Sequence, residues 1–175
     1  MSDLEEFRKR KDEFFQQNRQ SPLFPEQKRR FTGLAYFPEN PDLVIETELA
    51  EPEDKSELTM ETSTGDRQTY RRAGVVHFTV DGQPAQLTLY ESDPNAELFV
   101  PFRDATSGHE SYGAGRYLEV KRPEHGRVVV DFNYAYNPYC AYNSRWSCPL
   151  PPIENWLKVP IRAGEKDYPD KPGGH

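Results

Sequence analysis

Short runs of alternating apolar and polar residues fill most of the chain after residue 30, and they limit its fold more than any other feature. A period of two indicates β-strands, because successive side chains of a strand point to opposite faces of a sheet. The predicted strands cover residues 31–37, 42–49, 56–62, 68–80, 85–91, 97–103, 115–121, 127–133 and 157–161. Turn-forming residues separate these runs at intervals typical of an all-β domain.

Two of the turns predict hairpins between neighbouring runs. Asp81 and Gly82 form a two-residue connection, and a type I′ turn needs a positive φ at both of its central positions, which Asp-Gly tolerates well. Residues 64–66, Thr-Gly-Asp, predict a second hairpin, between the runs 56–62 and 68–80. Because hairpins make antiparallel neighbours, we predict a mainly β fold, an antiparallel β-barrel-like domain. A two-sheet β-sandwich is the alternative.

The first eighteen residues have a different period. Apolar residues recur at near-helical spacing among charged ones, from Leu4 to Phe15, and Ser2 or Asp3 is suited to cap a helix start. Pro22 and Pro25 cannot continue a helix. We therefore predict an amphipathic helix over residues 3–18 that covers an open end or edge of a sheet.

The segment from Val128 to Trp156 combines both cysteines and both tryptophans with many tyrosines and prolines. After its first strand it is irregular for about twenty residues, a length that is uncommon inside compact domains unless the loop is functional or disordered. Its aromatic content is the opposite of a disordered composition. We predict an ordered loop over 134–155 within a single domain, 1–175, which also holds a β meander over 31–133 and a final strand and turn over 156–166.

The net charge of −7 argues against a nucleic-acid-binding protein, which needs a basic surface. No stretch of 18 apolar residues predicts a membrane span, and the N-terminus is charged where a secretory signal is apolar. These features predict a soluble, cytoplasmic protein. They are equally compatible with a monomer and a C2 dimer.

Cys140 and Cys148 lie eight positions apart in the predicted loop. Cytosolic thiols are more often reduced than bridged, although a disulfide that closes the loop is a geometric alternative. Zinc ligands usually cluster at closer spacing, and no histidine pairs with these cysteines. We expect no metal site, and no motif indicates a cofactor.

Arg116 breaks the alternation, because it shares a strand face with Leu118 and Val120. A buried, unpaired charge costs several kcal/mol, so an inward arginine needs a carboxylate partner, and Asp131 on a nearby run is the obvious one. The arrangement suits either a structural ion pair or the recognition of an anionic ligand.

Three functions fit these features. The first is a barrel that binds a small polar or anionic molecule at a mouth built by residues 103–115 and 134–155. Its candidate ligand-binding residues are Tyr112, Arg116, Asp131, Asn133, Asn137 and Trp146. The second is a hydrolase-type enzyme that uses His109 as a base or Cys140 as a nucleophile. The third is a structural or interaction protein that docks through the 134–155 loop.

Three stretches carry a resemblance to a known family. GLAYFPEN at 33–40, ELFVPFRDATSGHESYGAGRYLEV at 97–120 and DFNYAYNPYCAYNSRWSCPLPPIENWLKVPIRAGEK at 131–166 resemble the DUF1684 family of bacterial and archaeal proteins, a domain of unknown function. The resemblance covers nearly the whole chain and implies a single domain. It implies no activity, cofactor or site residue.

Overall fold

The computed structural model describes residues 2–170 and begins with a helix, α1 (Asp3–Gln17). The Ser2 side chain accepts a hydrogen bond from the Glu5 amide (3.1 Å), as expected of a helix cap. The helix matches the predicted one to within a residue at its end. A short second helix, α2 (Pro25–Arg30), follows, which the sequence did not predict; Pro25 occupies its first helical position, which needs no amide donor.

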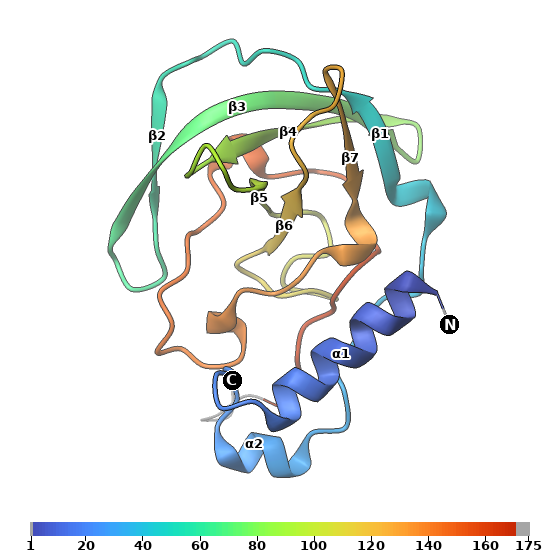
Figure 1. Cartoon of the computed structure of the whole chain (residues 1–175), viewed down its shortest axis with the longest axis vertical. Helices are drawn as coiled ribbons and strands as arrows, with labels where there is room; N and C mark the ends of the chain where they lie inside the picture. Colours follow the sequence, from blue (N-terminus) through green and yellow to red (C-terminus); the bar gives the residue numbers. More distant parts are fainter. Residues whose placement is uncertain (1, 171–175) are drawn as a thin grey trace.

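The strands form two antiparallel sheets, and β3 arcs across the top of the molecule (Figure 1). The strands are β1 (Val44–Glu48), β2 (Glu57–Glu61), β3 (Arg67–Val80), β4 (Gln83–Glu91), β5 (Leu98–Phe102), β6 (Arg116–Val120) and β7 (Arg127–Asp131). The larger sheet has the order β2-β3-β4-β5-β6, and the smaller pairs β1 with β7. Both predicted hairpins are present, and Asp81 (φ 51°) and Gly82 (φ 78°) have the positive φ values that their turn requires.

The predicted barrel is wrong, because no closed barrel forms and the arrangement is sandwich-like. Strand β6 pairs with β5, whereas β7 leaves that sheet to pair with β1. The sheets meet through a bridge between Ala50 and Val75. At this crossing a Cβ on Gly74 would lie 2.5 Å from the Leu49 side chain, so a residue without a side chain lets the two sheets approach.

Residues 31–37 and 157–161, both predicted as strands, form none. The first segment makes a single bridge, Tyr36 to Glu165, and the second follows a single bridge between Arg103 and Trp156. Isolated hydrogen bonds, such as that from the Phe37 N–H to the Gly164 carbonyl (2.9 Å), pair some backbone groups of these segments without forming a continuous row of strand–strand bonds. An alternating pattern therefore marks half-buried extended chain here, and not sheet.

The main core lies between the two sheets and consists of aliphatic side chains with a few aromatic ones. It includes Leu43, Val76, Leu87, Leu89, Leu98, Val100, Phe102, Leu118, Val120, Val128, Val130, Phe132 and Ile161. A second cluster lies under α1, where Phe15 contacts Phe31, Tyr139 and Tyr142. The helix thus packs on the long loop and on residues 31–36, where we had expected a sheet end or edge. No helix within residues 2–170 is long and apolar enough to cross a membrane.

Candidate functional site

Arg116 lies at the first position of β6, and its side chain is completely buried. Its Nη2 donates to Asp104 Oδ1 (3.3 Å) and to the Ile161 carbonyl (2.8 Å), and its Nη1 donates to the carbonyls of Ala163 (2.6 Å) and Glu165 (3.1 Å). Burial lowers the pKa of Arg116, and the Asp104 carboxylate opposes that shift. The inward orientation was expected from the alternation.

The expected partner of Arg116, Asp131, was wrong. Asp131 ends β7 in the smaller sheet, and its Oδ1 accepts hydrogen bonds from the Asn133 backbone N–H (3.0 Å) and side-chain amide (2.9 Å). Asn133 in turn bonds both the N–H (2.8 Å) and the carbonyl (3.0 Å) of Asn40. This pair therefore fastens the turn before β1 to the end of β7, and the hydrogen bonds described for it involve neither Arg116 nor Cys140.

Asn137 belongs to a buried network around Glu165, a residue that the sequence did not single out. Glu165 accepts hydrogen bonds from the Tyr142 hydroxyl (2.6 Å) and the Asn137 N–H (3.2 Å), and it pairs with Lys11 of α1. The Asn137 side chain donates to the Tyr142 hydroxyl (3.3 Å) and to the Lys166 carbonyl (2.9 Å). The network joins α1, the long loop and the C-terminal segment, so its arrangement is that of a structural anchor.

Tyr112 contacts Cys140, and Trp146 packs on Tyr139, the residue before Cys140. The Tyr112 hydroxyl lies 3.6 Å from Cys140 Sγ, and Trp146 packs edge-on against Tyr139 with ring centroids 5.1 Å apart. Both cysteines are free thiols. The structure therefore spreads the predicted ligand-binding residues over several places, although Arg116 and Asn137 both bond Glu165, and the roles assigned to them stay predictions.

The 103–115 loop was expected to build part of the mouth of the ligand site. Several of its amides bond within the loop: three of them, those of residues 109–111, donate to the carbonyl of Thr106 at 2.9–3.0 Å. Asp104 and Ser111 both bond the Thr106 hydroxyl (2.8 Å each). His109 lies exposed at the tip of this loop.

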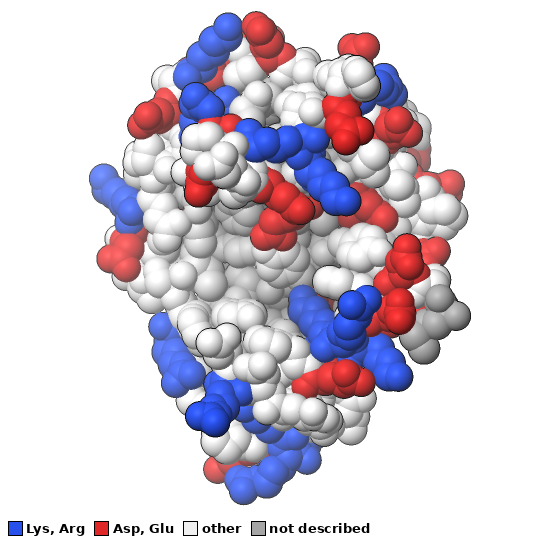
Figure 2. Space-filling view, in the orientation of Figure 1, with Lys and Arg blue, Asp and Glu red and all other residues white. Residues whose placement is uncertain are grey.

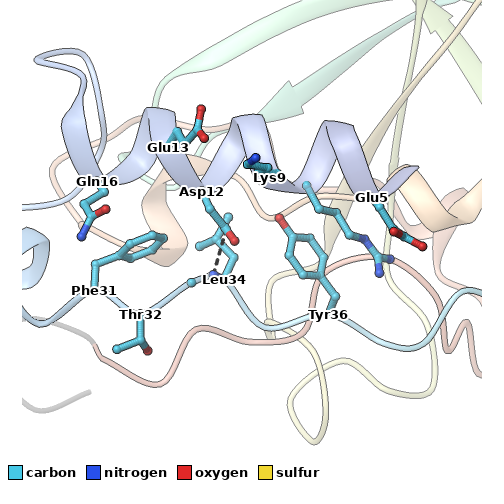
Figure 3. A pocket seen from close by; sticks show the side chains of 11 residues that line it. Glu5, Lys9, Asp12, Glu13, Gln16, Phe31, Thr32, Leu34 and Tyr36 are labelled. Carbon is cyan, nitrogen blue, oxygen red and sulfur yellow. Dashed lines mark hydrogen bonds between the residues drawn. The ribbon is translucent and has the colours of Figure 1, made fainter. Parts of the chain in front are cut away.

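A groove of about 540 Å³ lies between α1 and residues 31–36 (Figure 3). Asp12 closes its floor by accepting a hydrogen bond from the Leu34 N–H (3.0 Å), and Gly33 (φ 126°) permits the close approach, since a Cβ there would lie 3.3 Å from the Asp12 carboxylate. Figure 3 shows the Tyr36 hydroxyl pointing from this segment toward the helix. The groove thus combines a polar floor with an aromatic wall.

Arg8 lies over the Tyr36 ring, with its guanidinium carbon 4.3 Å from the ring centroid. Its Nε and Nη2 atoms and the Tyr36 hydroxyl are buried and have no hydrogen-bond partner among the described residues. Burial raises the pKa of Tyr36, so this hydroxyl is a neutral donor at physiological pH. The rim adds charges of both signs, from Glu5, Lys9 and Glu13.

The opposite side of α1 carries a second, more apolar groove of about 500 Å³. Phe7, Phe14, Tyr136 and Tyr139 line it, together with Arg10 and Lys11. Figure 2 shows lysine or arginine and acidic side chains interspersed over the lower right of the molecule, where Figure 1 places α1. No continuous basic surface covers this face.

Comparison with known proteins adds two similarities. Residues 29–166 match the model of a family described as "Protein of unknown function (DUF1684)". The solution NMR structure of an uncharacterized protein from Haloarcula marismortui is 39% identical, with a TM-score of 0.71, over 93% of this chain and 91% of that one. No curated protein matches the chain.

Proposed function

The chain belongs to the DUF1684 family, and because that family has no assigned activity we propose its function from geometry: it binds a small polar molecule with an anionic group in the groove between α1 and residues 31–36. One observation carries the proposal. The Nε–Nη2 edge of Arg8 is buried in this groove without an acceptor among the described residues.

This edge of a guanidinium is the one that binds carboxylates through two parallel hydrogen bonds. Two other arginines of the chain use it in that way. Arg30 Nε and Nη2 donate to the two oxygens of Asp170 (3.0 and 2.9 Å), and the same atoms of Arg72 donate to Glu154 (3.1 and 2.7 Å). Arg8 has the same donors at the groove, so a ligand carboxylate or a similar planar anion is the acceptor that fits them.

The energetics also favour an incoming anion. A buried donor that lacks a partner costs about 1–3 kcal/mol, and Arg8 has two such donors with the Tyr36 hydroxyl beside them. Access requires the guanidinium to move off the Tyr36 ring, which loses a cation–π contact of about 0.5–2 kcal/mol. Two relieved donors, at about 1–3 kcal/mol each, therefore offset the lost ring contact.

The rim restricts the class of ligand. Glu5 and Glu13 place negative charge near Lys9, so a polyanion such as a nucleoside triphosphate meets repulsion. A groove of about 540 Å³ is within the usual range for small-molecule sites. We infer a monoanionic ligand with additional hydrogen-bonding groups that reach the Tyr36 hydroxyl.

Arg116 was the centre of the ligand site proposed from sequence, and it does not line this groove. Its Nη1 and Nη2 atoms already donate to four protein acceptors. A ligand there would have to displace them. Arg8 is the better candidate because nothing has to be displaced from its Nε–Nη2 edge.

The test compares two arginine variants of the same helix. Arg8→Met keeps the aliphatic stem and removes the guanidinium, and Arg10→Met is the matched control, since Arg10 is 74% exposed at its side chain. Thermal melts with a panel of small carboxylic acids, together with native mass spectrometry of the purified protein, should reveal ligands that raise the Tm of wild type and of Arg10→Met. Arg8→Met should lose that response.

Equal responses in wild type and Arg8→Met would contradict the proposal. So would a panel in which only polyanions bind, because the acidic rim should exclude them.

A second function, docking of a second copy of the chain through the end of the long loop, has one observation in its favour. Ile153 is 77% exposed and Trp156 is 47% exposed, although both are large apolar residues. Light scattering of wild type and of Ile153→Ser separates the two functions: a self-association that the substitution abolishes supports docking, and it has no bearing on the Arg8 groove.

A further inference from the structure

Arg8 and Asp12 lie one helical turn apart on α1, and both line the groove between α1 and residues 31–36. Opposite charges at this spacing are neighbours on a helix surface and commonly pair. Here they do not. Within residues 2–170, neither side chain forms an ion pair with the other or with any other charged group. The groove therefore contains a cation and an anion that are close along the helix and remain separate.

The segment opposite the helix holds the two charges apart. The guanidinium carbon of Arg8 lies 4.3 Å from the centroid of the Tyr36 ring, and Asp12 Oδ1 accepts a hydrogen bond from the Leu34 N–H (3.0 Å). Each group keeps unused capacity. Arg8 Nε and Nη2 lack an acceptor, and Asp12 Oδ2 accepts no hydrogen bond from the described residues.

The surroundings of Asp12 favour a cation at its free oxygen. A Cβ on Gly33 would lie 3.3 Å from Asp12 Oδ2, so the missing side chain leaves space beside this atom. Burial raises the pKa of Asp12; the Leu34 N–H opposes the shift, and the nearby Glu165 adds to it. A positive charge near Oδ2 would stabilise the ionised carboxyl against both burial and Glu165.

We propose that the ligand of this groove is an α-amino acid with an apolar side chain, bound as its zwitterion. The inference rests on the proposed function of the groove and names the class of its ligand. The ligand carboxylate accepts from the Nε–Nη2 edge of Arg8, and the ligand ammonium donates to Asp12 Oδ2. Side chains one turn apart leave the helix about 5–6 Å from each other, and an α-amino acid carries its two charges on a single carbon, so one small molecule contacts both.

The order of residues along the groove places the ligand side chain. Figure 3 shows Tyr36 at one end of the groove, Leu34 opposite Asp12, and Phe31 opposite Gln16 at the other end. With its carboxylate at Arg8 and its ammonium at Asp12, the ligand extends its side chain toward Leu34 and Phe31. Both are apolar, and a ligand with an apolar side chain fits them best.

The paired charges also exclude related classes of ligand. A simple carboxylic acid leaves Asp12 without a cation, and a simple amine leaves Arg8 without an acceptor. A dicarboxylic acid brings a second negative charge near Asp12 and Glu5. A quaternary ammonium has no N–H to donate to Asp12.

The first test uses wild type and three probes that share one carbon skeleton. These are L-leucine, 4-methylpentanoate, which lacks the amine, and 3-methylbutylamine, which lacks the carboxylate. In calorimetric titrations at pH 7, L-leucine should bind at least roughly tenfold more tightly than either analogue, a ratio equal to about 1.4 kcal/mol. In amide NMR spectra, L-leucine should shift the Gly33 and Leu34 signals, because these amides lie beside Asp12.

The second test separates the two charges with variants. Asp12→Asn keeps an acceptor for the Leu34 N–H and removes the negative charge, so L-leucine should bind at least roughly tenfold more weakly, while 4-methylpentanoate should bind as it does to wild type. Glu13→Gln is the matched control, because Glu13 points away from residues 31–36 in Figure 3 and should leave both affinities unchanged. Arg8→Met should lose both probes.

The outcomes distinguish this inference from the proposed function. If 4-methylpentanoate binds wild type as tightly as L-leucine, and Arg8→Met abolishes that binding, the amino-acid assignment is overturned and the anion site stands. If L-leucine binds Arg8→Met as tightly as wild type, both are overturned. The absence of any response to L-leucine in wild type also overturns the amino-acid assignment, and the panel of carboxylic acids then decides the proposed function alone.

Discussion

Replacing Arg116 with methionine tests how strand β6 is joined to the C-terminal segment, residues 161–165. The change keeps a long apolar side chain among Phe37 and Phe102, whose rings lie within 6 Å of the guanidinium. It removes four hydrogen bonds at once and leaves Asp104 without its counter-charge. The three carbonyls that it bonded, all from residues 161–165, lose their shared donor.

The expected cost is about 3–5 kcal/mol, the usual penalty for breaking a buried charge pair by removing one member. Asp104 limits the loss, because its Oδ2 still accepts hydrogen bonds from the Ile161 N–H (2.7 Å) and the Thr106 hydroxyl (2.8 Å). The cost is nevertheless a large share of a typical total stability of roughly 5–15 kcal/mol. For a chain of this size it corresponds to a fall in Tm of roughly 6–20 °C.

Urea unfolding at pH 7 and 25 °C measures the effect, and Arg162→Met is the matched control. Arg162 pairs with Glu110 at 3.3 Å, but its side chain is 57% exposed, so its loss should change stability by less than about 0.5 kcal/mol. Asp104→Asn should also destabilise, and the double variant should recover part of the loss, with a coupling of about 0.5–3 kcal/mol. A cost below about 1 kcal/mol for Arg116→Met, or no coupling with Asp104, would refute the assigned pairing.

Three further predictions concern other parts of the structure. Lys11→Met should cost about 3–5 kcal/mol in urea unfolding, because it leaves the buried Glu165 carboxylate without a cation, whereas Lys9→Met on the same helix should be nearly neutral. Burial raises the pKa of Asp12 above its ordinary 3.8, so the folded state binds that proton more tightly and stability falls as the pH rises from about that value; Asp12→Asn keeps an acceptor for the Leu34 N–H and should abolish this fall in pH-dependent melts. Cys140 and Cys148 are free thiols; a disulfide between them would close a nine-residue loop and should stabilise the oxidised protein by about 2.5 kcal/mol relative to the reduced one, measured by paired urea titrations.

Local signals in the sequence predicted the local structure well. Ser2 and the apolar stripe located α1, and Asp81-Gly82 located the hairpin between β3 and β4, because both patterns act within a few residues. The connection of the sheets was not predictable in the same way. Periodicity shows which face of a strand is buried and says nothing about its neighbour, so the choice of β7 to pair with β1 instead of β6 was missed.

Because periodicity does not identify the neighbour of a strand, it also failed to identify the partner of Arg116. Alternation correctly predicted that Arg116 points inward, yet Asp131 was chosen as its partner because that residue lies in the next predicted strand along the chain. In the structure Arg116 opposes Phe102 in the β5–β6 register, which puts Asp104, two residues past Phe102, beside the guanidinium. A prediction that β5 and β6 pair as antiparallel neighbours would have placed Asp104 beside Arg116. No local signal marks Arg8, whose environment depends on Tyr36, far along the chain.

The same substitution, arginine to methionine, should have opposite effects on stability at Arg8 and at Arg116. Arg116→Met removes a guanidinium whose hydrogen bonds hold the fold, whereas Arg8→Met removes two buried donors that have no partner among the described residues. Relief of those donors is worth at least about 2 kcal/mol, and the lost cation–π contact costs about 0.5–2 kcal/mol. Ligand-free Arg8→Met should therefore be at least as stable as wild type in urea, while it loses the ligand-induced rise in Tm. Sites that bind ligands are often kept at such a cost in stability. A destabilisation of more than about 1 kcal/mol would mean that Arg8 supports the fold, and the groove would then need another explanation for its unpaired donors.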